Sequence, residues 1–112
     1  MKIANCENTI QQSDFLELEN FFGIRLPERF KSHYTTFNGG DIDFDENESN
    51  SNVIGYFLSI KFGSETIEKY LFEPDHIFPK MTLPFAVDSF GNFFIISLYH
   101  EDFGFVYRLM HE

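Results

Sequence analysis

Residues 83–98 have the sequence LPFAVDSFGNFFIISL, which has the pattern of two strands joined by a short turn. Leu83 to Asp88 is a short apolar strand, and the apolar run from Phe93 to Leu98 is typical of a buried central strand. The residues from Ser89 to Asn92 between them include the glycine and asparagine that tight turns favour. Because so short a connection joins antiparallel neighbours, this segment predicts the hairpin on which the sheet is built.

The strand pattern continues on both sides of this hairpin. Asp102-Phe103-Gly104 indicates a second turn, and Phe105 to Met110 a last strand. Val53 to Phe62 is rich in β-branched and aromatic residues that roughly alternate, which predicts another strand. Thr66 to Phe72 predicts a short helix capped by Ser64.

Two amphipathic helices precede these strands. The first begins at Ser13 or Asp14, either of which can cap it, and ends at Gly23. The second begins at Pro27, whose fixed φ suits the first helical position, and ends before Asn38-Gly39-Gly40. Its apolar residues predict one buried stripe: Phe30, Tyr34 and Phe37. Helices followed by strands with short turns predict an α+β fold, with two N-terminal helices packed on a mainly antiparallel sheet.

Length and composition are those of a small globular protein. A chain of 112 residues is long enough for one hydrophobic core, so we predict a single domain over residues 1–112. No apolar run approaches the roughly 20 residues that cross a bilayer, and residues 1–8 lack the apolar segment of a secretion signal. Cys6 is the only cysteine, so no internal disulfide forms, and we expect a cytoplasmic location.

The charge of the chain limits its partners. Eighteen acidic residues against eight Lys and Arg give a formal net charge of −10. This charge repels phosphates and anionic lipid headgroups, so we expect neither nucleic acid nor a membrane as a partner. The same charge speeds association with a basic protein, although acidity also serves solubility alone. The composition therefore favours a protein partner with positive charge.

The acids are concentrated between Asp41 and Asn52, where no basic residue opposes them. We interpret this segment as a surface loop, with a short strand near Ile42 to Phe44, and as a candidate partner-binding surface. A solvated loop without a partner is the alternative. The candidate contact residues are Asp41, Asp43, Asp45, Glu46 and Glu48.

The sequence has no convincing catalytic or metal-binding signature. Asp41, Asp43 and Asp45 resemble the start of a calcium loop, but its sixth position is Glu46, where that loop needs glycine, and its twelfth is Asn52. No nucleophile elbow is present. Scattered histidines are more often surface or capping groups than bases. We therefore predict no enzyme activity, no metal and no cofactor.

Two segments together resemble the SUKH superfamily. Residues 21–31, continuing to Phe37-Asn38-Gly39-Gly40, are similar to its helical opening "GI-x-LP…F…NGG". Residues 83–98, with Gly104-Phe105-Val106-Tyr107, resemble its "LPFA-x-D-x-x-GN" hairpin and its last strand "G-x-VY". The order and spacing of these pieces span residues 15–111. Many members continue past this strand into a further C-terminal helix, whereas this sequence stops at His111-Glu112.

The resemblance implies an α+β fold, no known catalytic activity and a role in protein binding. Bacterial members are typically immunity proteins for polymorphic toxins, often nucleases, whereas fungal relatives are regulatory scaffolds. We therefore expect an immunity protein that binds a cognate, basic toxin, with a regulatory scaffold as the alternative. The motif residues themselves are predicted to serve the fold. We assign turns and caps to Gly23, Pro27, Asn38, Gly39, Gly40, Gly91 and Asn92, and the core to Phe30, Phe37, Phe85 and Val106.

Overall fold

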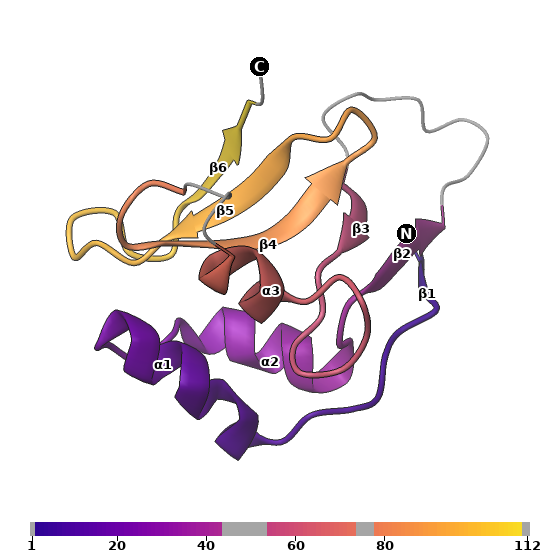
Figure 1. Ribbon diagram of the computed structural model, residues 1–112, viewed down its shortest axis with the longest axis horizontal. Coiled ribbons are helices and arrows are strands. Elements are labelled where there is room, and N and C mark those ends of the chain that lie inside the picture. Colours follow the sequence, from indigo (N-terminus) through magenta and orange to yellow (C-terminus); the bar gives the residue numbers. More distant parts are fainter. Residues whose placement is uncertain (1, 44–53, 74–77, 111–112) are drawn as a thin grey trace.

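The computed structural model describes residues 2–43, 54–73 and 78–110, which form an antiparallel sheet and a group of helices (Figure 1). Neighbours in the sheet follow chain order, and every pair of strands is antiparallel. This arrangement confirms the predicted α+β class. The strands are β1 (Lys2–Ala4), β2 (Gly40–Asp43), β3 (Ile54–Phe57), β4 (Thr82–Asp88), β5 (Phe93–Ser97) and β6 (Val106–Leu109). The helical segments are the 3₁₀ turn η1 (Gln12–Phe15), α1 (Leu16–Phe22), α2 (Glu28–Thr36) and α3 (Ile67–Phe72).

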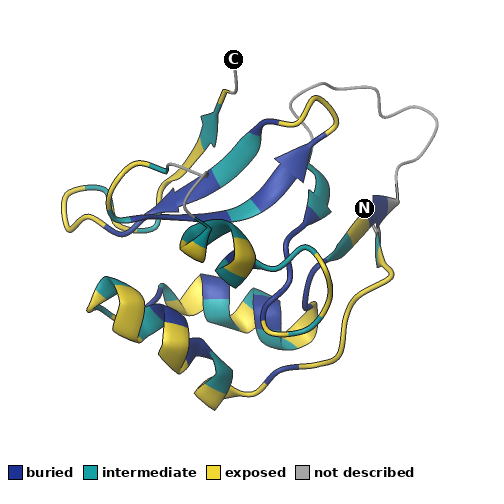
Figure 2. Cartoon of the chain, viewed as in Figure 1, coloured by how far each residue is buried: buried dark blue, intermediate teal, exposed yellow. Residues whose placement is uncertain are grey.

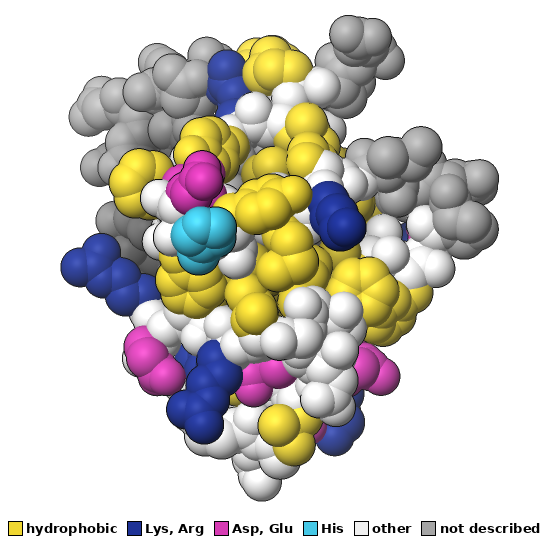
Figure 3. All heavy atoms as spheres, turned by 90° about the vertical axis from the view of Figure 1, so that its left-hand side faces the viewer, with side chains coloured by type: hydrophobic (Ala, Val, Ile, Leu, Met, Phe, Trp, Pro, Cys, Tyr) yellow, Lys and Arg dark blue, Asp and Glu magenta, His cyan; other side chains and the backbone are white. Residues whose placement is uncertain are grey.

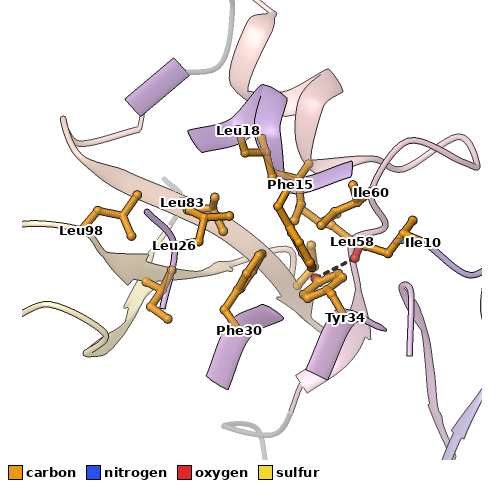
Figure 4. Close-up of a cluster of buried hydrophobic side chains, with 13 residues drawn as sticks. Ile10, Phe15, Leu18, Leu26, Phe30, Tyr34, Leu58, Ile60, Leu83 and Leu98 are labelled. Carbon is orange, nitrogen blue, oxygen red and sulfur yellow. Dashed lines mark hydrogen bonds between the residues drawn. The ribbon is translucent and has the colours of Figure 1, made fainter. Parts of the chain in front are cut away.

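The three α-helices lie on the same side of the sheet (Figure 1), and the main core fills the space between the two layers. Burial is concentrated along β4 and β5 and on the inward sides of the helices (Figure 2). Removal of this apolar surface from water is the main stabilising contribution. The core side chains converge as Figure 4 shows: Ile10, Phe15, Leu18, Leu26, Phe30, Tyr34, Leu58, Ile60, Ile67, Leu83, Val87, Ile96 and Leu98.

The predicted central hairpin is present as β4 and β5. Gly91 has a φ of 88°, which glycine adopts without strain. The buried carboxylate of Asp88 accepts hydrogen bonds from the backbone N–H of Phe90 at 2.8 Å and of Asn92 at 3.0 Å. Burial disfavours the charge of Asp88, but these bonds, the amide of Asn92 and the Arg108 guanidinium outweigh it and lower its pKa. The Asp of the motif therefore fixes a turn.

The N-terminal caps predicted for the first helix and for α3 are both wrong. The first helix begins earlier than Ser13 or Asp14, with a 3₁₀ turn in which the Asp14 carboxylate accepts the backbone N–H of Gln11 at 2.8 Å. The cap of α3 is Thr66 instead of Ser64, and its hydroxyl accepts the N–H three residues further on. A cap needs an extended backbone, and Thr66 is held extended by a bridge to the chain after β3.

Two side chains that were predicted in the core, Phe37 and Val106, are exposed instead. Phe37 is 37% exposed, because it has an extended backbone after the end of α2 and leaves the helical stripe. Val106 is 54% exposed, because β6 is an edge strand that extends beyond the helices (Figure 1). Phe30 is buried and Phe85 is half-buried against the core, as predicted.

The β1 end of the sheet differs most from expectation. The strand β1 was not predicted, and it pairs Ile3 with Ile42 of β2. The strand expected to reach Phe62 ends at Phe57, because the Asn38 side-chain amide then takes over the backbone groups of Ile60. The start of that predicted strand, Val53, lies outside the described residues.

Candidate functional site

The structure places the first acids of the predicted contact segment in the sheet. Asp41 and Asp43 belong to β2, so the short strand expected near Ile42 to Phe44 is present but begins earlier, and the expected loop is wrong at Asp41. The reason is the unpredicted strand β1, whose Ala4 lies opposite Asp41. The other candidate acids, Asp45, Glu46 and Glu48, lie outside the described residues.

Asp41 lines a surface hollow of about 230 Å³, which we call the acidic hollow and define by Glu7, Asp41, Tyr56, Ser64 and Glu65. Asp41 pairs with Tyr56 across β2 and β3, and its carboxylate accepts the side-chain amide of Asn5 at 3.0 Å. Burial and the carboxylates of Glu65 and Asp41 raise the pKa of Tyr56, so its hydroxyl stays protonated beside them. The hollow thus combines negative charge with an aromatic wall.

The opposite wall is formed by the turn before α3. Glu65 accepts a hydrogen bond from the Tyr70 hydroxyl, and the Lys69 ammonium lies 3.7 Å from the same oxygen of Glu65. Burial and the Glu65 carboxylate raise the pKa of Tyr70 above its usual range. One of the three acids of the hollow is therefore partly neutralised within the protein, and Glu7 and Asp41 hold its outward charge.

The glycine-rich motif before β2 shapes this hollow. Gly40 has a φ of 106°, and a Cβ at this position would lie 2.7 Å from Ile3 and 3.0 Å from the thiol sulfur of Cys6. Two positions earlier, the Asn38 side chain donates to the carbonyls of Asn8 and Ile60 and accepts the N–H of Ile60. These contacts tie the N-terminal segment, β2 and the chain after β3 together. Of the three residues predicted to serve the turn, Gly39 has the expected left-handed backbone, whereas Gly40 belongs to β2 and Asn38 acts through its side chain.

His33 and Cys6, two residues of types that often take part in catalysis, have aromatic and acidic surroundings respectively. His33 lies between the rings of Tyr34, Phe37 and Phe57, with centroids 4.7 to 5.7 Å away. Burial, with the carboxylates of Asp41 and Glu7, raises the pKa of the Cys6 thiol, which opposes formation of a thiolate. Within residues 2–43, 54–73 and 78–110, no group of His, Cys, Asp and Glu could hold a metal ion.

Sequence reasoning identified Asp41 but missed Glu7, Tyr56 and Glu65. These residues are far apart in the chain, and only the pairing of β1, β2 and β3 brings them to one place. The strand pattern was visible in the sequence, but the pairing of a three-residue strand was not. What the arrangement can do is accept a cationic side chain, since carboxylates attract it electrostatically and a tyrosine ring can lie against it.

The antiparallel sheet, its one-sided helical layer and the acidic hollow define an α+β protein whose described surface is suited to contacts with another protein. The model of the SMI1 / KNR4 family (SUKH-1) matches residues 9–112, and the chain belongs to this family. Comparisons with curated proteins and with solved structures give no match. Among the described residues, no helix has the length and hydropathy needed to cross a membrane.

Proposed function

We propose that this protein is an immunity protein that binds and neutralises a cognate protein toxin in the cytoplasm. The family match over residues 9–112 is the observation that carries the proposal. Members of this family are generally non-catalytic immunity or regulatory proteins, so binding is the expected activity, with no enzymatic step. We treat residues 1–112 as one binding domain.

The charge of the chain supports a basic toxin, such as a nuclease that contacts phosphates through Lys and Arg. A net charge of −10 attracts such a surface over distances that salt does not fully screen. The acidic hollow offers it a local contact, because Glu7 and Asp41 are exposed there. We keep Asp41, Asp43, Asp45, Glu46 and Glu48 as the predicted charged contact segment.

Co-expression tests this function directly. The toxin encoded beside this gene is expected to kill cells when produced alone and to be tolerated when this chain is produced with it. A complex of the two purified proteins should form on mixing. Equal killing with and without the chain, together with no complex, would refute the proposal.

The same family match leaves a regulatory scaffold as the second candidate. A scaffold would form stable complexes with cellular proteins and would have no neighbouring toxin gene. Inspection of the adjacent genes, followed by purification of complexes from cells, separates the two functions.

The charged contact segment has its own test. Asp41→Lys is expected to weaken toxin binding by about tenfold, because it reverses an exposed charge in the acidic hollow. Glu28→Lys is the matched control, since Glu28 is exposed at the start of α2 and gives the same change in net charge. Equal affinities of the two variants would remove Asp41 from the interface.

A further inference from the structure

An apolar groove lies at the end of the molecule away from β1 and β2. Two hollows of about 480 and 400 Å³ adjoin at Met81, which lines both. Figure 3 shows a band of hydrophobic side chains over this face, which is the left-hand side of Figure 1. We call it the hairpin groove and define it by Phe21, Phe22, Ile24, Met81, Tyr99 and Phe103.

Three aromatic side chains of this groove are exposed to solvent. Phe21 is 53% exposed, Tyr99 is 47% exposed and Phe103 is 43% exposed. On the helical wall, the Phe21 ring packs edge-on against Phe22 and Phe72 at about 5 Å between centroids. Contiguous apolar surface of this kind marks interaction sites in soluble proteins.

Hydrogen bonds hold the other wall in place. The Asp102 carboxylate accepts the hydroxyl of Ser97 and, at 2.7 Å, the hydroxyl of Tyr107. The backbone N–H of Leu98 donates to the carbonyl of Met81 at 2.8 Å, which ties together the residue before β4 and the residue after β5, and both of them line the groove. The connection between β5 and β6 is therefore fixed before any partner arrives. A preformed groove loses less conformational entropy on binding than a loop that must be ordered.

The charges around the groove indicate what fills it. A second copy of this chain would bring another net charge of −10, which opposes association. Lys80 lines one of the two hollows, and Glu101 stands 85% exposed beside the other, with the equally open His100 as an ion-pair neighbour at 3.9 Å. A basic protein meets both conditions, because its positive charge is complementary to Glu101 and to the whole molecule.

We propose that the hairpin groove receives an apolar or aromatic side chain of the toxin, with a neighbouring Lys or Arg of the toxin paired with Glu101. This proposal rests on the proposed function and adds the surface that anchors the partner. Such apolar anchors, placed in preformed pockets and bordered by charge, carry most of the binding energy in protein interfaces.

The test compares two exposed phenylalanines in binding to an inactive variant of the toxin encoded beside this gene. Phe103→Ser removes a ring of the groove that is 43% exposed, whereas Phe90→Ser removes a more exposed ring, at 61%, from the turn between β4 and β5. We expect Phe103→Ser to weaken binding by at least about tenfold and Phe90→Ser to leave it unchanged. Isothermal titration calorimetry measures both, and thermal unfolding shows whether each variant is folded.

A second pair of variants keeps the proposal falsifiable if Phe103→Ser unfolds. Glu101→Lys reverses a charge beside the groove without touching the core. Glu17→Lys gives the same change in net charge at an exposed position of α1, close to Glu68 and outside the groove. We expect Glu101→Lys to weaken binding more than Glu17→Lys. Equal effects mean that only the overall charge matters, and they overturn the proposal.

The remaining outcomes distinguish a failure of the groove proposal from a failure of the proposed function. If the unaltered chain forms no complex with the toxin, the proposed function fails and this proposal fails with it. If the complex forms and Phe103→Ser binds as Phe90→Ser does, the function stands and the groove is not the anchor. Light scattering of the chain alone gives the last outcome: a dimer that Phe103→Ser dissociates assigns the groove to a second copy and overturns the proposal.

Discussion

The Tyr34 hydroxyl is a buried polar group that fastens α2 to the sheet. It donates to the carbonyl of Leu58 at 2.8 Å and lies 3.0 Å from the carbonyl of Phe85, and Figure 4 shows the first of these contacts. Tyr34→Phe leaves both carbonyls without this donor, so we expect a loss of about 1–3 kcal/mol in the free energy of unfolding. Urea denaturation measures it. Tyr99→Phe is the control, because Tyr99 is exposed and the loss of its hydroxyl should cost less than about 0.5 kcal/mol.

His33 makes the fold sensitive to mild acid. Burial lowers the pKa of His33, and its Nε2 has no hydrogen-bond partner among the described residues. The unfolded chain therefore binds the proton more readily than the folded one, so the stability present above about pH 6.5 falls as the pH drops through that value. His33→Phe is expected to reduce the pH dependence of the free energy of unfolding below about pH 6.5.

The titration of Glu68 does not obscure the contribution of His33 to the pH dependence of stability. Burial raises the pKa of Glu68, so its contribution has the opposite sign: stability is greatest at low pH and is lost as the pH rises through the raised pKa. The difference in unfolding free energy between the unaltered chain and His33→Phe at each pH removes the contribution of Glu68 and of every other group that the two proteins share. Identical pH profiles of the two proteins would show that His33 does not carry the acid sensitivity.

Two glycines with the same left-handed backbone, one crowded by a neighbouring element and one not, allow a matched comparison. Gly39, before β2, has a φ of 76°, and a Cβ there would lie 2.9 Å from the Cβ of Ser59. Gly23, after α1, has a φ of 75°, and a Cβ there would meet nothing within 4 Å. Both alanine variants bear the cost of the left-handed backbone, about 1 kcal/mol. Gly39→Ala should cost at least about 1 kcal/mol more, measured by urea denaturation. Equal losses would show that the contact with Ser59 relaxes freely.

Sequence reasoning predicted the elements whose signals are local. The hairpin of β4 and β5 and the end of α1 at Gly23 depend on turn residues and periodicity within a few positions. The strand β1 escaped prediction because three residues carry no periodicity, and its stability comes from pairing with Ile42 and its neighbours. The exposure of Phe37 was missed for a related reason: periodicity does not show where a helix stops. The candidate site could be predicted only at Asp41, since its other residues meet through that pairing.

At the scale of the whole molecule, the charged and apolar surfaces lie at opposite ends of the sheet (Figure 1). The acidic hollow lies near β1, β2 and β3, and the hairpin groove lies beside the connection from β5 to β6. Charge acts over a distance of about one Debye length, about 10 Å at moderate salt, whereas apolar packing acts only on contact. The two surfaces are therefore expected to govern different steps of binding.

Association kinetics with the toxin test this division. The association rate is expected to fall by roughly tenfold or more between about 0.05 M and about 0.5 M salt, because screening weakens the attraction of a chain with charge −10 for a basic partner. Asp41→Lys should lower the association rate at low salt and converge with the unaltered chain at high salt. Phe103→Ser should instead raise the dissociation rate at every salt concentration. Stopped-flow fluorescence measures both rates, and an association rate that is independent of salt would exclude electrostatic steering by this protein.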